Sequence, residues 1–300
     1  MKQPTFLFIV FLLLSFPFLS GGVEISMESQ FAISMPLIFT VGIAHGSVDN
    51  ILYMKKTKIK PLGFYLTYLF LVGIYAATWF IFPIFAILLF LLISAYHFGQ
   101  SQLVDCFRNE KLLHKILYVS WGIALLSAFL NVKQIEIVAL LNRYDDLRIF
   151  ATTFDTSYLY YLHISSTVTV AFILLYLTIT KQLLSGRMFF EFFMLILINV
   201  SFAALPVLLG FTLYFTFLHS LKVLEDEFNF LKSKEHLHTW SFIKKLLPNT
   251  LISITATLLI FAGIYFDYIN LSYGFVLLVL ISSTTFPHVF VMEKFYNSQA

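Results

Sequence analysis

The sequence predicts an all-α membrane protein, a polytopic helical bundle of about ten (8–10) transmembrane helices. Of its 300 residues, 59% are hydrophobic and 12% are charged, whereas a soluble domain carries about 25% charged residues. Many of its apolar runs approach the ~20 residues that a helix needs to cross a bilayer. These runs lack the alternation typical of a closed barrel. We therefore expect one integral membrane domain over residues 1–300.

The expected spans follow one another with short connections. Proline separates the third from the fourth span at Pro83, and the seventh from the eighth at Pro206, unless Pro206 only kinks one long helix. The segment 1–22 is either a retained span or a signal segment, because Lys2 precedes an apolar run that ends in "LSGG". The ten hydrophobic segments are 5–22, 31–54, 61–81, 83–104, 112–131, 158–181, 187–203, 206–223, 244–265 and 272–296.

The charges between the spans predict the orientation of the chain. Fifteen lysines and arginines follow even-numbered spans and three follow odd-numbered ones. The positive-inside rule then places the even ends and both termini in the cytoplasm, for a multi-pass protein of the inner (cytoplasmic) membrane. Residues 132–157 become an extracytoplasmic loop, in which "IEIVALLNRYDDLRIF" fits an interfacial amphipathic helix, and residues 224–243 become a cytoplasmic loop.

The composition excludes a nucleic-acid partner and any structure that needs several cysteines. The basic residues are distributed over the loops, so they indicate topology and no nucleic-acid partner. The single cysteine, Cys106, excludes an intramolecular disulfide framework and a thiolate metal cage. The lipid bilayer is the expected surrounding of the protein.

Four histidines fall inside the predicted spans. His45, His97, His219 and His288 all lie in the later part of even-numbered spans, and so at similar depth towards the cytoplasmic side. Each one alone is explained by an imidazole bonded to a nearby carbonyl group. The set of four indicates a shared metal site, since imidazole is the commonest metal ligand that proteins provide, and nitrogen donors suit iron, copper or zinc.

Other residues near these histidines add to the hypothesis. Asp49 follows His45 by four residues, so in a regular helix its carboxylate would hold that imidazole in place. Gly46 and Gly99 would let helices or a ligand approach closely. The remaining histidines lie at span edges or in loops, where we expect solvated or interfacial side chains: His114, His163, His236 and His238.

The chemistry of such a site follows from its donors and surroundings. A ferrous ion held only by histidines, with an open position, can bind O₂. The chain has 36 phenylalanines and 16 tyrosines, so a substrate would be a lipid-soluble hydrocarbon, long and flat. No side chain here is an obvious acid or base, and catalysis would depend on the metal and on positioning.

At these residues the sequence resembles the Brp/Blh family, the membrane β-carotene 15,15′-dioxygenases of bacteria and archaea. Four family motifs occur in order between residues 40 and 293. They are "HGSVD" from His45 to Asp49, "SAYHFG" from Ser94 to Gly99, "YFTFLHS" from Tyr214 to Ser220, and "FPHVFV" from Phe286 to Val291.

The resemblance implies an Fe²⁺ cofactor and cleavage of the central double bond of β-carotene, or of a related carotenoid, by O₂ to two molecules of retinal. His45, His97 and His219 would be iron ligands, and His288 or water would supply the fourth position. Asp49 and Tyr214 would support these ligands. A functional link to a retinal-binding rhodopsin would follow from the product.

Two departures from the family pattern leave alternatives open. Asn50 replaces a histidine that often follows the motif aspartate, and Val223 replaces a second histidine four residues after His219. The chain is then a dioxygenase with altered ligation, an enzyme for another polyene, or a non-catalytic carotenoid- or retinal-binding membrane protein. A transporter that uses Asp49, a desaturase and a haem protein rank lower.

Overall fold

The structure is a computed structural model that describes residues 3–20, 25–107, 111–154, 157–184 and 186–297. Within these ranges the secondary structure is helical, with no strand. Nine helical segments there are long and apolar enough to cross a membrane, which confirms the predicted polytopic helical bundle. They are Met27–Lys56, Pro61–Ile81, Pro83–Cys106, Leu112–Val132, Tyr158–Ile179, Arg187–Ala204, Val207–Glu235, Thr239–Tyr265 and Tyr273–Asn297.

The chain divides into two compact units. Unit 1 comprises Met1–Val48 and Val200–Ile260, and unit 2 comprises Asp49–Asn199 and Phe261–Ala300. The prediction of a single membrane domain concerns the whole chain and stays a prediction. Two helices pass from one unit's residues to the other's: α10 (Arg187–Ala204) and α13 (Thr239–Tyr265).

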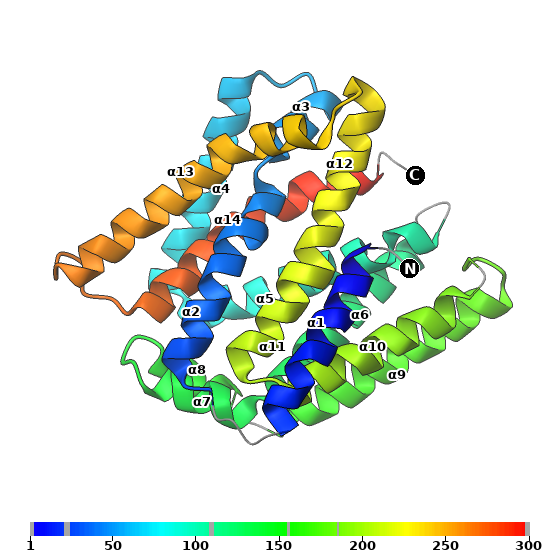
Figure 1. The fold of residues 1–300 in the computed structure, drawn as a ribbon, viewed down its shortest axis with the longest axis horizontal. Coiled ribbons are helices and arrows are strands. Elements are labelled where there is room, and N and C mark those ends of the chain that lie inside the picture. Colours follow the sequence, from blue (N-terminus) through cyan, green and yellow to red (C-terminus); the bar gives the residue numbers. More distant parts are fainter. Residues whose placement is uncertain (1–2, 21–24, 108–110, 155–156, 185, 298–300) are drawn as a thin grey trace. The chain divides into compact units, whose positions relative to one another are not determined.

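Unit 1 is built around helices that depart from regular α geometry. Helix α1 packs against η4, and α2 packs against α11 (Figure 1). The span that carries His45 changes from α to π to 3₁₀ geometry along its length. The elements of this unit are α1 (Gln3–Ser20), α2 (Met27–Leu37), η1 (Ile38–Gly42), η2 (Ala44–Gly46), α11 (Val207–Leu213), η4 (Tyr214–Ser220), α12 (Leu221–Glu235) and most of α13.

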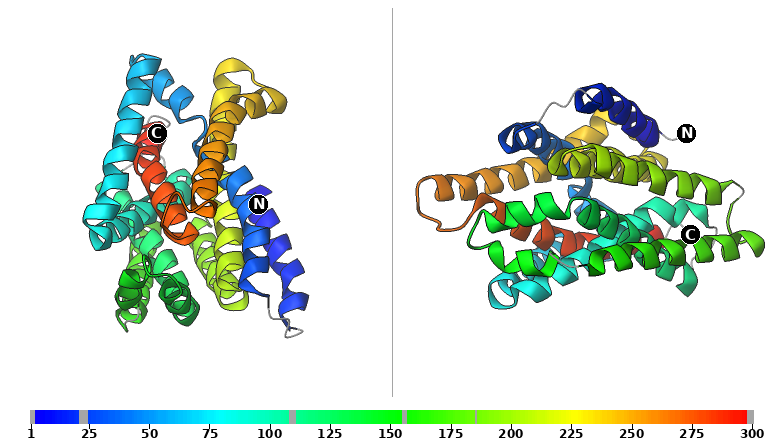
Figure 2. Two further views of the ribbon diagram at one scale, coloured as in Figure 1. Left: turned by 90° about the vertical axis from the view of Figure 1, so that its left-hand side faces the viewer. Right: turned by 90° about the horizontal axis from the view of Figure 1, so that it is seen from below.

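Unit 2 contains long helices with regular geometry. Helix α6 packs against both α5 and α9, and α14 packs against α3, α4 and α5; α14 (red) runs beside α4 (cyan) in Figure 2. The elements are α3 (Asp49–Lys56), α4 (Pro61–Ile81), α5 (Pro83–Leu103), η3 (Val104–Cys106), α6 (Leu112–Val132), α7 (Gln134–Asn142), α8 (Arg148–Phe154), α9 (Tyr158–Ile179), most of α10, and α14 (Tyr273–Asn297).

Glycine sets the close packing of α5 on α6. A Cβ atom at Gly99 would overlap the backbone carbonyl of Tyr118, and a Cβ atom at Gly122 would overlap that of Ala95. Small residues at such crossings let membrane helices approach closely. The expectation that Gly99 permits a close helix approach is therefore confirmed, and this contact fixes the helix that carries His97.

The segment 132–157 differs from its expected form. Instead of one amphipathic helix it forms α7 and α8, separated by residues 143–147. Aspartate and asparagine favour turns because they bond to nearby backbone groups. Asp146 also makes a long-range contact, since its Oδ2 accepts a hydrogen bond from the Ser272 N–H at 2.7 Å. Phe150 and Phe154 of α8 pack into the hydrophobic core of unit 2. The segment is therefore part of a packed structure.

The prolines divide the chain as one of the two readings predicts. Helix α4 ends at Ile81 and α5 begins at Pro83, while Pro206 separates α10 from α11 and does not merely kink one helix. The stretch 224–243, expected to be a loop, is mostly helical. Helix α12 continues the span as far as Glu235, and α13 begins at Thr239. Lys222 pairs with Asp226 at 3.3 Å along α12, and such pairs one turn apart support a helix outside an apolar run.

Candidate metal centre

Two of the predicted ligands meet in unit 2. His97 lies on α5 and His288 on α14, and both side chains are buried. Their ring centres are 4.9 Å apart and the ring planes are almost perpendicular, at 88°. Two residues 191 positions apart in the sequence thus form one edge-on imidazole pair.

A carboxylate holds one member of this pair. The Nδ1–H of His288 donates to both oxygens of Asp49, each at 3.0 Å, and Asp49 is buried. The Tyr68 hydroxyl also donates to Asp49, at 3.1 Å. A proton on Nδ1 places the lone pair of His288 on Nε2, which is the state in which an imidazole binds a metal.

The predicted partnership of Asp49 with His45 is not what the structure has. That prediction needs a continuous helix, in which residues four apart lie on one face. Here η2 ends at Gly46 and α3 begins at Asp49, so the helix is interrupted between the two side chains. Asp49 binds His288, and the Nδ1–H of His45 points to the carbonyl oxygen of Gly42.

The other two predicted ligands meet in unit 1. His45 lies in η2 and His219 lies in the π-helix η4. Their ring centres are 5.2 Å apart, with an angle of 81° between the planes. Short π-helical segments occur frequently at functional sites, and here one positions His219 beside an irregular segment of the neighbouring span.

Aromatic rings extend this second pair along the helix. Phe215 stacks on His219 with ring centres 5.6 Å apart and also meets the edge of His45 at 5.8 Å. Phe211 stacks on Phe215 at 5.7 Å with an angle of 9°. A Cβ atom at Gly42 would lie 2.8 Å from the Phe215 ring. Gly42 therefore makes room for this stack and supplies the carbonyl that holds His45.

The ring separations of both pairs match those of imidazoles that share one ion. With metal–nitrogen bonds of about 2.0–2.1 Å, two imidazoles on one ion have their ring centres roughly 4.5–5.2 Å apart. The observed separations are 4.9 and 5.2 Å. Neutral nitrogen donors of this kind suit iron, copper or zinc, so the donors that the chain provides fit the iron that the resemblance implies.

Three further residues from the sequence analysis have defined places. Tyr214 is buried at the start of η4 and contacts Phe202 edge-on at 6.1 Å. Val223 is fully buried on α12. Asn50 donates a hydrogen bond from Nδ2 to the Tyr65 hydroxyl at 2.8 Å. The role of Tyr214 in supporting the ligands stays a prediction.

Of the remaining histidines, His236 and His238 are exposed, as expected, whereas His114 and His163 have structural contacts. His114 is buried, contrary to expectation: its ring stacks on Phe107 at 3.9 Å and its Nδ1 accepts the Lys111 N–H at 3.2 Å, at the start of α6. His163 lies 3.1 Å from the Ala124 carbonyl oxygen. His114 was misjudged because a side chain near a span edge can be covered by a neighbouring segment that the sequence does not reveal.

A polar cluster beside the unit 2 pair was missed by the sequence analysis. Glu293, one to two turns after His288 on α14, accepts hydrogen bonds from Lys115 at 2.5 Å, from Gln100 at 2.6 Å and from the Tyr96 hydroxyl. These partners belong to α5 and α6, and Tyr96 directly precedes His97. The cluster ties together the two helices that carry this pair, and only its charged character gave a signal in the sequence.

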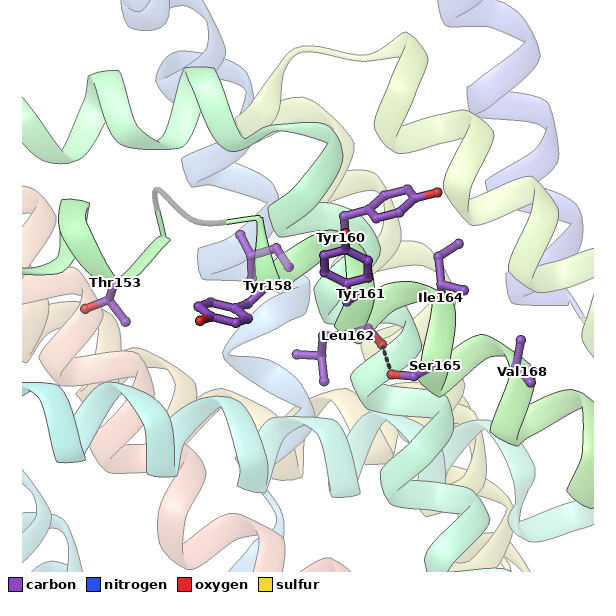
Figure 3. A pocket seen from close by; sticks show the side chains of 9 residues that line it. Thr153, Tyr158, Tyr160, Tyr161, Leu162, Ile164, Ser165 and Val168 are labelled. Carbon is purple, nitrogen blue, oxygen red and sulfur yellow. Dashed lines mark hydrogen bonds between the residues drawn. The ribbon is translucent and has the colours of Figure 1, made fainter.

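An open pocket of about 830 Å³ lies where α8 ends and α9 begins (Figure 3). Its lining includes Tyr158, Tyr160 and Tyr161, all exposed. None of the predicted histidine ligands is among the described residues that line it. Tyrosines at the end of an apolar helix are typical of the membrane–water interface, so this feature indicates membrane placement and not the chemistry.

Fold and site together define a class: a polytopic helical membrane protein with paired histidines inside its spans. Comparison with known families then identifies the family of this chain. The family described as beta-carotene 15,15'-dioxygenase matches residues 36–296, and the chain belongs to this family. No curated protein and no solved structure matches the chain. The resemblance inferred from the four motifs is confirmed.

Proposed function

We propose that this chain binds Fe²⁺ through His45, His97, His219 and His288. We further propose that it uses O₂ to cleave the central double bond of β-carotene, or of a related carotenoid, to two molecules of retinal. The observation that carries the proposal is the arrangement of the four histidines as two edge-on pairs, with ring centres 4.9 and 5.2 Å apart. Membership of the dioxygenase family supports the reaction class.

The proposal of one shared ion comes from the sequence. All four histidines lie in the later part of the predicted even-numbered spans, and so at similar depth. Imidazole is a common metal ligand, and a set of four at one depth indicates a shared site.

Iron(II), when bound, supplies the one-electron chemistry that reaction with O₂ requires. The residues of the chain position the groups around it. Asp49 orients His288 and the Gly42 carbonyl orients His45, each through Nδ1. Such partners fix the ring orientation and the tautomer of a ligand. Positioning of this kind contributes several kcal/mol to an oriented reaction, on the order of 7–11 in the most favourable cases.

The aromatic rings support the choice of substrate. Phe211, Phe215 and His219 form a continuous stack of rings on one side of the helical segment 211–219, with ring centres 5.7 and 5.6 Å apart. Flat conjugated hydrocarbons pack well against such faces, because offset stacking of π-systems is favourable. We infer that this stack holds part of the polyene beside the metal centre.

The proposed setting is the inner membrane. The lysine-rich ends of the spans and both termini would face the cytoplasm, and the substrate would enter from the lipid phase. Retinal released there would be available to a retinal-binding rhodopsin.

The test uses bacterial cells that already make β-carotene. We would express the full chain beside His97→Ala, His219→Ala and a control, His163→Ala, which removes a histidine bonded to a carbonyl outside both pairs. Retinal, assayed by chromatography, is expected from the wild type and the control and not from the first two variants. No retinal despite good membrane expression would contradict cleavage of β-carotene. Bound pigment in that sample would then favour the carotenoid-binding alternative that Val223 suggests.

A further inference from the structure

Tyr68 is connected to the unit 2 histidine pair through Asp49. It lies on α4, and its hydroxyl donates to Asp49 Oδ2 at 3.1 Å. Both oxygens of Asp49 in turn accept from His288 Nδ1 at 3.0 Å. The chain of hydrogen bonds Tyr68–Asp49–His288 therefore connects three helices, α4, α3 and α14.

The Tyr68 hydroxyl also faces the helix that carries the histidine. It lies 3.5 Å from the carbonyl oxygen of Thr284, which precedes His288 by one helical turn. The ring packs against Phe64 with centres 5.5 Å apart, so the position of the hydroxyl is set by packing on its own helix. Tyr68 is thus placed to fix both the carboxylate and its distance from α14.

A carboxylate can rotate about its terminal bond, because that torsion has broad minima. In a buried site, a carboxylate with one partner can swing between orientations, whereas a second hydrogen bond on the same oxygen restricts it. Asp49 is only 3% exposed, so water offers little competition for these bonds. The Tyr68 hydroxyl therefore restricts the carboxylate to the orientation that receives His288 Nδ1–H and presents Nε2 away from it.

We propose that Tyr68 is a positioning residue of the metal centre, which acts through Asp49 to hold His288 in its metal-binding orientation. The inference rests on the proposed function, because it assumes that His288 binds a metal. Replacing a residue that hydrogen-bonds to a metal ligand typically lowers metal affinity by about 10–100-fold. Tyr68 is one residue further from the ion than Asp49, so we expect the lower end of this range, about tenfold.

The chain contains a matched control on the same helix. Tyr75 is buried seven residues after Tyr68, contacts Phe286 of α14, and donates its hydroxyl to the Ala86 carbonyl at 2.7 Å. Tyr75→Phe removes a buried hydroxyl from the same face of α4 without touching Asp49. Tyr68→Phe and Tyr75→Phe therefore make the same chemical change and differ in their connection to the histidine.

The experiment measures metal binding by the full-length chain in detergent, without oxygen. Fe²⁺ retained per chain is determined against a graded series of chelator concentrations, and melting temperature is recorded for each variant. Co²⁺ then replaces iron as a spectroscopic probe, because its visible absorption follows ligand geometry. We expect Tyr68→Phe to retain Fe²⁺ about tenfold more weakly and to shift the Co²⁺ spectrum, with Tyr75→Phe close to wild type in both.

The outcomes separate this inference from the function on which it rests. Equal retention and equal spectra in wild type and Tyr68→Phe would overturn the role of Tyr68 and leave the proposed function standing. Equal losses in both variants, parallel to their melting temperatures, would overturn it as well, because the hydroxyl would then act only on stability. A wild-type chain that binds neither ion would overturn the proposed function itself.

Discussion

The two histidine pairs are held by different means. In unit 2, His97 and His288 lie on long α-helices, and a buried carboxylate fixes one ring. In unit 1, His45 and His219 lie in 3₁₀ and π segments, where a backbone carbonyl and stacked phenylalanine rings fix them. Side-chain charge orients one pair, and local backbone geometry orients the other. Substitutions should therefore affect the two pairs through different physical causes.

The largest expected effect concerns the sharing of one ion. If both pairs bind the same ion, His97→Ala and His219→Ala should each remove nearly all retained iron, from one Fe²⁺ per chain in the wild type. Iron content of the purified variants, measured by elemental analysis, checks this. Two ions per wild-type chain, with half remaining in each variant, would show that the pairs are separate sites.

Removal of the charge on Asp49 should come next. Asp49→Asn keeps the shape of the side chain but weakens its hold on the His288 Nδ1–H, since a bond to a charged acceptor is roughly twice as strong as a neutral one. We expect a loss of Fe²⁺ affinity of about 10–100-fold. Chelator competition measures it, with Asn50→Ala as a neighbouring control that removes the bond to Tyr65. Equal losses of Fe²⁺ affinity in the two variants would contradict the role of Asp49 in orienting His288.

The corresponding change in unit 1 should act through shape. In Gly42→Ala the added methyl group would lie 2.8 Å from the Phe215 ring and would displace it. We expect retinal formation to fall several-fold, mainly through a higher KM, with iron content nearly unchanged. Gly210→Ala is the control, because its added methyl would meet neighbours only at 3.5 Å or more. A large loss of iron in Gly42→Ala would show that the stack orients the ligands more than the substrate.

The smallest effect should be on stability. Glu293→Gln weakens the cluster with Lys115, Gln100 and Tyr96, whose charged members are 38% and 27% exposed. A cost of about 1 kcal/mol follows for a partly exposed, charge-assisted network, which corresponds to a melting temperature lower by a few °C.

Thermal unfolding measures the effect of Glu293→Gln. The matched control in unit 1 is Glu235→Gln, which removes an ion pair with Lys245 at 3.4 Å. A larger loss in the control would contradict the view that Glu293 braces α5, α6 and α14.

The sequence was sufficient for the spans because each apolar run acts locally. Pro83 and Pro206 separate helices as predicted, although Pro36, Pro248 and Pro287 lie inside helices. The four histidines were identified by their shared position within the spans. The helical irregularities were not predictable in this way. The π segment Tyr214–Ser220 and the break between His45 and Asp49 depend on packing between helices, which hydropathy does not record.

Contacts between residues that are far apart in the sequence could not be predicted from it either. Asp49 lies four residues from His45, and sequence proximity favoured that pair. The structure instead gives Asp49 to His288, and it adds Tyr68, a residue in an ordinary aromatic run. A single sequence can rank candidate ligands by type and depth, but it cannot determine which residue holds each ligand.

The contact between Asp49 and His288 also bears on biosynthesis. It joins residues 239 positions apart, so a ribosome must have completed almost the whole chain before the contact can form. Long-range contacts of this kind form late, since loop closure costs entropy that local contacts avoid. The first spans must therefore reside in the membrane with the Asp49 carboxylate not yet joined to its histidine. Under the proposed function, iron would be loaded only at the last stage of maturation, after insertion of α14, and a chain truncated before that helix would be inserted without iron.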